Sequence, residues 1–268
     1  PHNMGQESLD EWVADSGDGH PDRCLSFTVS GPWGHFRRVE GNVVKQTYRI
    51  IPRTTVAGLL AAVLGIERDG YYDLFASGSS AIAIEPVRAI RTLNMPMNTL
   101  STASGNLQSL NGPGKISVKL PNPTALRQQH NYEVLVEPAY RVDVWLAETA
   151  RYRELREMLE SGKSHYVPSL GLSEHLAEIE YHGEFDVETV SENERIEVDS
   201  AVPNAVDDVV LRAGTRCQVE ESPAFMRADS GGRTTTEFTT YAYNPDAQPL
   251  VIDGIDTVAV DGRNVVFV

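Results

Sequence analysis

Alternating apolar and polar residues mark the first regular element of the chain. Leu25, Phe27 and Val29 are separated by single polar residues, and Gly31-Pro32 ends the pattern. A period of two is typical of a strand with one buried face, and a Gly-Pro pair interrupts regular structure. The pattern predicts a strand over residues 23–30.

A second segment is continuously apolar and has the flanks of a helix. It reads Val-Ala-Gly-Leu-Leu-Ala-Ala-Val-Leu over residues 56–64 and is followed by Gly65. Glycine is favoured just after a helix and threonine at its start, so Thr54 or Thr55 is the expected N-cap. Pro52 fits a non-helical approach to that cap. We expect a helix that ends at Gly65.

Later segments complete a simple order of elements. Residues 81–93 and 132–146 are rich in β-forming residues, residues 148–160 have the apolar stripe of a helix, and residues 179–190 read as another strand. The predicted order is β-α-β-β-α-β. This is the ferredoxin-like α+β arrangement, which RNA-recognition domains also use.

These elements predict the organisation of the chain. Residues 1–22 form an acidic extension, and the three residues ahead of Met4 are expected to be an expression remnant. Residues 23–190 form the ferredoxin-like domain, and residues 191–268 form a β-rich C-terminal subdomain. The connection 94–131 is rich in Gly, Pro, Asn and Ser, and so long a connection is uncommon unless it has a function. We expect a thumb-like hairpin insertion there.

Composition excludes several classes of protein. Hydrophobic residues make up 41% of the chain, which is enough for a packed core. No apolar run reaches the roughly 18 residues of a membrane span, and no secretory signal follows Met4. The two cysteines have no metal-site spacing, and no phosphate-binding glycine loop or nucleophile elbow occurs. We therefore expect a cytoplasmic protein without membrane contact, metal or cofactor.

The net charge of −15 points to an unusual solvent. Only four of the 23 basic residues are lysines, while 38 residues are acidic. At molar salt the Debye length is about 3 Å, so a surface excess of carboxylates repels little and stays hydrated. This composition favours a halophilic protein over an ordinary acidic one.

The acidic residues are unevenly distributed along the chain. Residues 41–130 carry nine basic and four acidic side chains, and no acidic residue occurs among the 45 positions from Pro86 to His130. That stretch keeps arginine, lysine and many amides, so simple burial does not explain the missing carboxylates. Such donors without carboxylates suit phosphates and base edges. We expect the middle block to form one positive face that binds nucleic acid.

Several motifs resemble the CRISPR-associated family numbered five. They occupy residues 27–37, 48–65, 127–141 and 166–174, and the most specific is Pro-Arg-Thr-Thr-Val-Ala-Gly-Leu-Leu at 52–60. The resemblance covers about residues 23–180, and within the family it is closest to the subtype I-B branch. With the acidic composition, it indicates a haloarchaeal member.

The resemblance implies a role in antiviral defence. Family members sit at the foot of the Cascade complex and hold the 5′ handle of the crRNA, so that they act on target DNA only indirectly. Their implied protein partners are the Cascade backbone subunit and the large PAM-reading subunit. A hairpin thumb of the family reaches into the RNA path, which is where the insertion 94–131 belongs.

The expected RNA contacts combine this resemblance with donor chemistry. The start of the first helix offers free N–H groups to a phosphate, and basic or amide side chains flank the first and third strands. The expected RNA-binding residues are Arg37, Arg38, Lys45, Arg49, Arg53, Thr54, Thr55, Arg91, Lys115, Lys119, Arg127, Gln128, Gln129 and His130.

An alternative is a metal-independent endoribonuclease that processes precursor crRNA, as the corresponding family member does in one Cascade subtype. His35, Lys45 and Tyr48 would then supply acid–base catalysis and stabilise the phosphorane. The spacing of these three residues is not diagnostic, and a separate endonuclease serves the I-B branch. The sequence therefore favours a non-catalytic protein.

Overall fold

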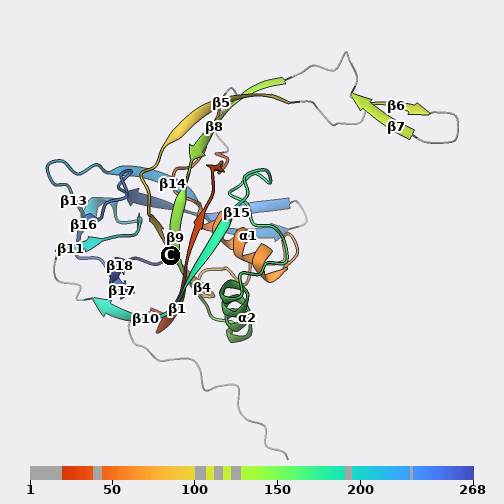
Figure 1. Cartoon of the computed structure of the whole chain (residues 1–268). Helices are drawn as coiled ribbons and strands as arrows, with labels where there is room; N and C mark the ends of the chain where they lie inside the picture. Colours follow the sequence, from red (N-terminus) through yellow and green to blue (C-terminus); the bar gives the residue numbers. More distant parts are fainter. Residues whose placement is uncertain are drawn as a thin grey trace, which may run out of the picture.

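The fold is mostly β, with a curled antiparallel sheet and few helices (Figure 1). The computed structural model describes residues 20–38, 44–99, 107–111, 117–121, 128–190, 195–229 and 232–268. Predictions that fall on other residues, including the acidic extension 1–19, lie outside the described residues.

Six antiparallel strands form the main sheet, in the order β18-β17-β10-β1-β9-β4. Their bounds are β1 (Arg23–Ser30), β4 (Ser80–Pro86), β9 (Ala139–Leu146), β10 (Glu178–Val190), β17 (Thr257–Val260) and β18 (Arg263–Val265). β1 has the predicted bounds and lies between β10 and β9. Beyond β18, Val268 and Ile82 exchange two backbone hydrogen bonds of 3.0 Å, which brings the chain back to β4. The sheet is therefore curled.

The predicted helices are confirmed as α1 (Arg53–Leu64) and α2 (Thr149–Glu160). α1 ends at Gly65, which has a left-handed φ of 71°. The predicted N-cap is wrong: Pro52 is the cap, and Thr54 and Thr55 lie in the first turn, because the backbone N–H of Thr55 donates to the oxygen of Pro52 (2.8 Å). Neither threonine hydroxyl therefore caps the helix, and the cap has no side-chain hydrogen bond.

The two predicted β-rich stretches each contain a break. The first is divided into β4 and β5 (Thr92–Thr99), and the second into β8 (Gln128–Val136) and β9. Glu137 separates β8 from β9 with a positive φ of 48°, which interrupts the extended backbone. β4 and β9 belong to the main sheet, whereas β5 and β8 leave it.

One face of the main sheet packs against both helices. Leu25, Phe27 and Val29 of β1 join one buried cluster with residues of α1 and α2. Tyr241 and Tyr243 also belong to this cluster, and β14 (Gln218–Asp229) contacts α1 on its outer side. α1 is therefore enclosed by the sheet and by the C-terminal strands, which explains why its sequence is apolar on every side.

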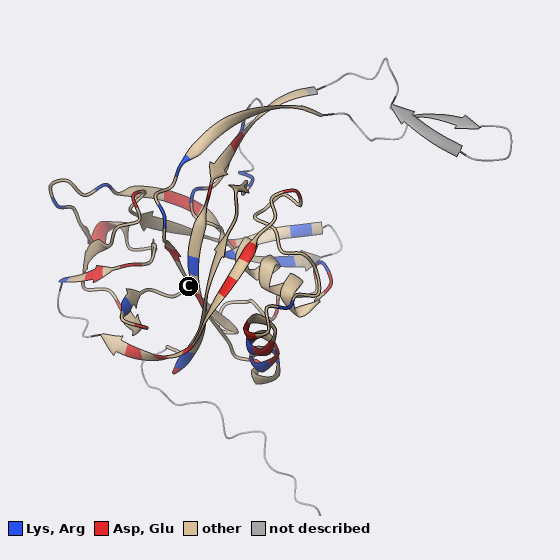
Figure 2. Ribbon diagram, viewed as in Figure 1, with Lys and Arg blue, Asp and Glu red and all other residues tan. Residues whose placement is uncertain are grey.

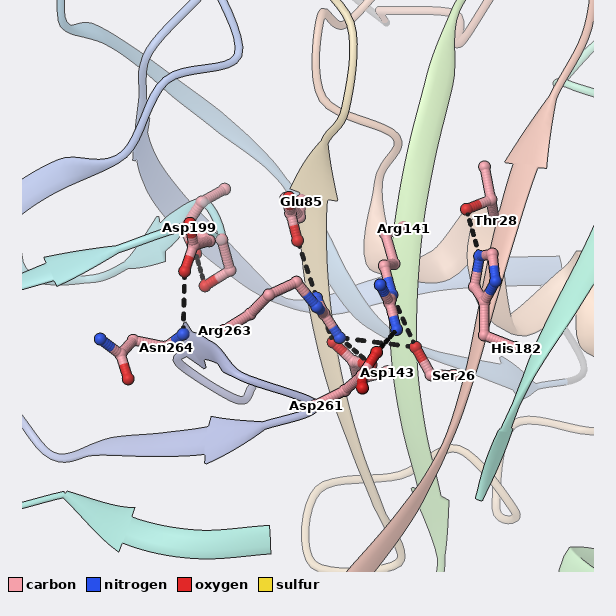
Figure 3. A network of polar contacts seen from close by, with 12 residues as sticks. Ser26, Thr28, Glu85, Arg141, Asp143, His182, Asp199, Asp261, Arg263 and Asn264 are labelled. Atoms are coloured by element: carbon pink, nitrogen blue, oxygen red, sulfur yellow. Dashed lines mark hydrogen bonds and ion pairs between the residues drawn. The ribbon is translucent and has the colours of Figure 1, made fainter. Parts of the chain in front are cut away.

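The other face of the sheet carries a partly buried ion-pair network (Figure 3). The Arg263 guanidinium donates to Asp143 Oδ1 (2.8 Å) and to Glu85 Oε2 (2.7 Å). Arg141 donates to Ser26 Oγ (2.9 Å) and pairs with Asp261. Since Asp143 is 1% exposed in its side chain, these contacts link β18 to β9 and β4 across the interior of the curl.

Two long strands form an arm that projects from the body (Figure 1). β5 and β8 pair antiparallel from Thr92↔Leu135 to Thr99↔Gln128, and we call this pair the arm. β6 (Leu107–Asn111) and β7 (Ser117–Pro121) form a further antiparallel hairpin. The predicted hairpin within residues 94–131 is therefore present, although its strands begin earlier and end later.

The base of the arm is tied to the body by two short strands. β2 (Trp33–Gly34) pairs antiparallel with β8, and β3 (Val44–Lys45) pairs parallel with it. We call residues 33–38 and 44–49, together with residues 133–136 of β8 and the turn after it, the root. The root therefore joins the region after β1 to the arm.

The C-terminal region is rich in β-structure, as expected. It contains η1 (Val206–Asp208) and, besides β14, the strands β11 (Arg195–Val198), β12 (Val202–Pro203), β13 (Val209–Val210), β15 (Gly232–Tyr243) and β16 (Leu250–Asp253). These strands form the sheets β11-β16-β13 and β12-β15-β14, while β17 pairs with β10. The division of the chain at residue 190 stays a prediction.

Arg53 lies in the core at the start of α1 and is 1% exposed. Its guanidinium lies 4.1 Å from the centroid of the Phe225 ring, and no acidic partner binds it among the described residues. Its hydrogen bonds go to Val268 O (3.1 Å), Phe75 O (2.8 Å), Ala224 O (3.4 Å), Ser80 O (3.2 Å) and Ser80 Oγ (2.6 Å). Burial lowers the pKa of Arg53 to about 10. This position contradicts the predicted RNA contact of Arg53, because every N–H group that would meet a phosphate is already used inside.

We expect Arg53→Gln to lower the free energy of unfolding by about 3 kcal/mol, because the shorter amide leaves buried carbonyl oxygens without donors. Urea unfolding followed by circular dichroism measures the loss. Arg37→Gln, at an exposed position, is the control and is expected to change stability by less than about 0.5 kcal/mol. Equal stability of the two variants would contradict the role of Arg53 as an internal link.

The loop after α2 packs closely on the root. The backbone N–H of His35 donates to Leu170 O (3.0 Å), and that of Leu170 donates to His175 O (2.7 Å). Gly171 has a φ of +92°, and a Cβ there would lie 1.9 Å from His35 O. Only glycine fits this position, both for its backbone angle and for its contact.

We expect Gly171→Ala to destabilise the protein by about 2 kcal/mol or more, because the added methyl group overlaps a backbone atom. The matched control is Gly214→Ala, at a φ of +87° with no atom within 4 Å of the built Cβ. That control carries only the left-handed strain of about 1 kcal/mol. Thermal unfolding of both variants separates the overlap from the strain, and equal losses would mean that the loop is not closely packed on His35.

Candidate functional site

The root gathers several basic residues that are spread along the sequence. Residues 33–38 lie against residues 44–49, because the backbone N–H of Tyr48 donates to Phe36 O (2.8 Å) and Arg37 forms a bridge with Thr47. Arg37 is exposed and Lys45 is half-buried. The predicted residues Arg37, Arg38, Lys45 and Arg49 therefore do lie in one region, at the base of the arm.

Carboxylates from outside the middle block bind two of these four cations, Arg38 and Arg49, and also bind Arg91. Arg49 Nη2 lies 2.6 Å from Glu133 Oε1, and Arg91 Nη2 lies 2.7 Å from Glu137 Oε2. Arg38 lies 3.5 Å from Glu220 Oε1. The stretch without acidic residues in the sequence is therefore not free of carboxylates in space.

Glu220 reaches the root from β14 and is buried. It accepts from the backbone N–H groups of Arg49 (2.7 Å) and Ile50 (3.2 Å) through Oε2. Burial raises the pKa of Glu220, while these two hydrogen bonds and the nearby Arg49 and Arg38 charges oppose the rise. This side chain fixes the backbone ahead of α1, so its role is structural.

The single positive face that we expected is not formed by the described residues. Of the nine basic residues of the middle block, Arg53 is buried, and Arg49 and Arg91 are each bound to a glutamate. Lys115 and Arg127 lie outside the described residues. In Figure 2 acidic and basic positions are interspersed over the body. A map of charge along the sequence was therefore a poor guide to charge on the surface.

The arm beyond its root carries no charged residue at 92–99 or 128–132 (Figure 2). Directly paired residues of an antiparallel ladder share a face, so the register assigns two faces. Met95 pairs with Tyr132 and Met97 with His130 on the first face, which we call the ring face. The ring face is half-buried at all four positions.

The opposite face of the arm is lined with amides, and we call it the amide face. Asn98 pairs with Gln129, Pro96 with Asn131, and Asn94 lies one pair nearer the root. All of these positions except Pro96 carry a side-chain amide that donates and accepts hydrogen bonds. The predicted residues Gln129 and His130 thus lie on opposite faces of the same strand.

The ring face continues into the root through a row of rings. The ring centroids of His130 and Tyr132 are 6.3 Å apart, and those of Tyr132 and His35 are 5.2 Å apart, both edge to face. His35 is 1% exposed, and its Nδ1 lies 2.8 Å from Glu133 O. Lys45 of β3 pairs directly with Tyr132. The rings are therefore held in place, and one lysine lies beside them.

The remaining predicted contacts are placed as follows. Thr54 and Thr55 are half-buried, and Thr54 Oγ1 donates to Pro223 O of β14 (3.4 Å). Gln128 is the first residue of β8, and Lys119 lies on β7, where the structure describes only the backbone. The structure therefore does not bring the start of α1 together with the arm.

The residues of the alternative catalytic group lie partly inside the root. His35 is buried, and burial lowers its pKa, while a backbone hydrogen bond to Glu133 opposes the decrease. Tyr48 is 7% exposed and has the Arg38 guanidinium 5.2 Å from its ring centroid. Lys45 is the most accessible of the three.

Two further findings concern the described part of the chain. None of its helices is long and apolar enough to cross a membrane. Within the same residues, no group of three or more His, Cys, Asp or Glu side chains is arranged to hold a metal ion.

Three contributors to this site were not expected from the sequence. Tyr132, Met95 and Met97 define the ring face, and the alternation of large and amide side chains in 129–132 was the available signal. The binding of Arg38 by Glu220 left no local signal, because the two residues are 182 positions apart.

Comparisons with solved structures give likenesses that are too weak to argue from. A CRISPR protein from Archaeoglobus fulgidus is 18% identical, with a TM-score of 0.49, and the alignment covers 91% of this chain and 98% of that one. A chain of a CRISPR RNA-guided surveillance complex is 11% identical, with a TM-score of 0.45, over 85% of this chain and 90% of that one. A chain of a type III-B Cmr-beta complex bound to cognate target RNA and AMPPnP is 12% identical, with a TM-score of 0.45, over 85% and 86%.

The family assignment rests on the sequence itself. No curated protein matches the chain. A family model described as CRISPR-associated protein (Cas_Cas5) matches residues 24–240, which is most of the chain and includes β1, α1, the arm and α2. The chain therefore belongs to the CRISPR-associated Cas5 family.

Proposed function

We propose that this protein is a non-catalytic subunit of a type I Cascade complex and binds the 5′ handle of the crRNA in the cytoplasm. The observation that carries the proposal is the arm, a projecting two-stranded ribbon whose described residues beyond the root carry no charge. A ribbon without carboxylates can approach a polyanion without repulsion. Membership of the Cas5 family supports the same role.

The ring face is the side of the arm that we assign to RNA. His130 and Tyr132 are half-buried rings held edge to face, with Lys45 beside them. Bases of a single strand stack on aromatic side chains, and a nearby lysine compensates phosphate charge. Duplex RNA hides its bases, so this face suits an unpaired handle.

The amide face supports a second kind of contact. Asn94, Asn98, Gln129 and Asn131 offer donors and acceptors in an uncharged row. Such a row can bind base edges or the polar surface of a neighbouring subunit. We assign it to the protein partners, namely the Cascade backbone subunit and the large PAM-reading subunit, through which target DNA is engaged.

The finer features of the prediction belong to the same proposal. The strands β10-β1-β9-β4 lie in that order, with α1 between β1 and β4 and α2 between β9 and β10 along the chain. This arrangement supports the ferredoxin-like interpretation. The charge of −15 and the scarcity of lysine support a haloarchaeal, subtype I-B-like member.

A double variant, His130→Ala with Tyr132→Leu, tests the ring face. We expect it to weaken binding of the crRNA handle at least tenfold, because stacking contributes about 1–3 kcal/mol for each base. Fluorescence anisotropy with labelled single-stranded handle RNA measures the affinity, and circular dichroism checks that the fold is kept.

Gln129→Ala, on the amide face of the same strand, is the matched control and should change RNA affinity less than twofold. The reverse result, a large loss for Gln129→Ala and none for the double variant, would show that the faces are assigned the wrong way round. Unchanged affinity in both would remove the arm from the RNA-binding site.

The endoribonuclease alternative keeps one specific observation in its favour. His35 and Lys45 of the predicted group both lie against Tyr132, so an imidazole and an amine lie close to a phenol, although this phenol is not the predicted Tyr48. These are the groups of a metal-independent cleavage.

We expect the purified protein to leave its repeat RNA intact in the presence of a chelator, because His35 is buried and engaged with Glu133. Gel analysis of end-labelled repeat RNA makes the measurement. Cleavage at one position, abolished by Lys45→Ala but kept in Lys163→Ala, would establish the alternative and reject the non-catalytic proposal.

A further inference from the structure

Two buried histidines lie where the loop after α2 meets the root. His35, next to β2, is 1% exposed, and His175, in the loop, is 8% exposed. Among the described residues neither histidine belongs to a group that could hold a metal ion, and neither is assigned to RNA in the non-catalytic proposal. Histidine is the side chain whose charge ordinarily changes near neutral pH. Two histidines inside one packed contact therefore make that contact a candidate for control by acid.

Leu170 joins the two histidines through the backbone. Its carbonyl oxygen accepts from the N–H of His35 (3.0 Å), and its own N–H donates to His175 O (2.7 Å). The N–H of His175 donates to Leu172 O (3.0 Å), so the loop turns back on itself between residues 170 and 175. Leu170 is fully buried in the main core cluster. Each histidine is therefore one backbone hydrogen bond from the same core residue.

The ring of His35 has no place for a second proton. Its Nδ1 lies 2.8 Å from Glu133 O, and a carbonyl oxygen only accepts, so Nδ1 carries the hydrogen of the neutral ring. Its Nε2 is buried and has no hydrogen-bond partner among the described residues. A proton added to Nε2 would place a charged donor in the interior with nothing to accept from it, which costs free energy.

The ring of His175 has a similar environment. Its Nδ1 is buried without a hydrogen-bond partner in the part of the chain that the structure describes. Burial lowers the pKa of His175, the neighbouring Glu174 opposes the decrease, and a charge on His35 adds to it. The two rings are therefore close enough to repel each other when both are protonated.

The charged groups that face the pair do not compensate a proton. Burial lowers the pKa of His35, the backbone hydrogen bond to Glu133 opposes the decrease, and the charge of Arg37 adds to it. The carboxylates of Glu133 and Glu174 favour the protonated ring, but the first is engaged in an ion pair and the second is exposed. The Tyr132 phenol is the other titratable neighbour, and its ring packs edge to face on His35. None of these groups binds either of the two nitrogens without partners.

We propose that His35 and His175 form an acid-sensitive joint that releases the loop 166–177 from the root. Above the ordinary histidine pKa of about 6.5 both rings are neutral whether the loop is closed or open, so pH has no effect on opening there. As the pH falls below that value, the rings of the open form gain protons first, because the closed form resists them. Acid therefore favours opening, which removes the hydrogen bond between His35 and Leu170. The inference does not rest on the proposed function, because its contacts and its test involve only the protein.

Hydrogen exchange of the whole protein, followed by mass spectrometry, tests the joint. Exchange of the peptide 166–177 is measured at about pH 7.5 and about pH 5.5, and each rate is divided by the intrinsic rate at that pH, so that only the opening equilibrium is compared. We expect opening to increase at least about tenfold at the lower pH, since each histidine that stays neutral in the closed form contributes about tenfold one unit below its ordinary pKa. α1 should keep its protection, which distinguishes release of the loop from unfolding of the molecule.

His175→Phe and His35→Gln separate the joint from general acid sensitivity. Phenylalanine fills the space of the imidazole and cannot be protonated, and glutamine keeps an N–H donor for Glu133 O. Each variant is expected to reduce the pH effect on loop opening about tenfold. Because this effect is a ratio within one variant, a loss of stability common to both pH values cancels. His182→Gln, which changes an exposed histidine of β10, is the matched control and should keep the full effect.

NMR titration of the histidine rings in the unaltered protein is a second measurement, and the signals of His35 and His175 should change only over the pH range in which the loop opens. Loop exchange that does not depend on pH, or that depends on it equally in both variants and in the unaltered protein, would reject the joint. Loss of protection in α1 together with the loop would mean that acid unfolds the whole molecule, which also rejects it. Neither result bears on RNA binding by the arm, which has its own variants.

Discussion

The guanidinium of Arg263 is the interaction on which the closure of the sheet depends. β18 has only three residues and forms a ladder with β17, yet Arg263 reaches Asp143 on β9 and Glu85 on β4 (Figure 3). A buried carboxylate without its cation would be costly, so these charges favour the curled arrangement over a flat sheet. The closure brings Val268 to Ile82. It also lets the Val268 carbonyl oxygen accept a hydrogen bond from Arg53, the residue at which α1 begins. The half-buried Arg263 therefore supports the position of the buried Arg53.

Local sequence patterns were sufficient to predict much of this fold, but they were insufficient to predict most of the contacts in the candidate site. β1 and both helices follow from periodicity and from Gly65, because such signals act within a few residues. The arm followed from a long connection with unusual composition. The role of Arg53 could not be read in this way, since its partners Val268 and Ala224 lie 215 and 171 residues away. The ion pair between Arg49 and Glu133 is likewise non-local, so the sequence did not indicate that the charge of Arg49 is neutralised.

The described residues of the arm beyond the root carry no charge, so the arm does not attract phosphate by electrostatics. Its contribution to binding comes from its projecting shape and from its two faces, which differ in side-chain type because residues alternate along each strand. Rings and methionines lie on one side and amides on the other, which allows one ribbon to contact two unlike partners at once. The exposed cation Arg37 and the half-buried Lys45 lie at the root, so long-range attraction would act there first.

The pairing of Val268 with Ile82 also has a consequence for folding. Ile82 of β4 and the residues that close over it, Val268 and the donor-bearing strand β18, are far apart along the chain. Contacts so distant raise the contact order and slow folding, because a long loop must close before they form. Until that loop closes, the edge of β4 that does not pair with β9 keeps unpaired backbone N–H and C=O groups, which can pair with a strand of another molecule. The open form of the sheet is therefore the state in which the chain is most prone to aggregate.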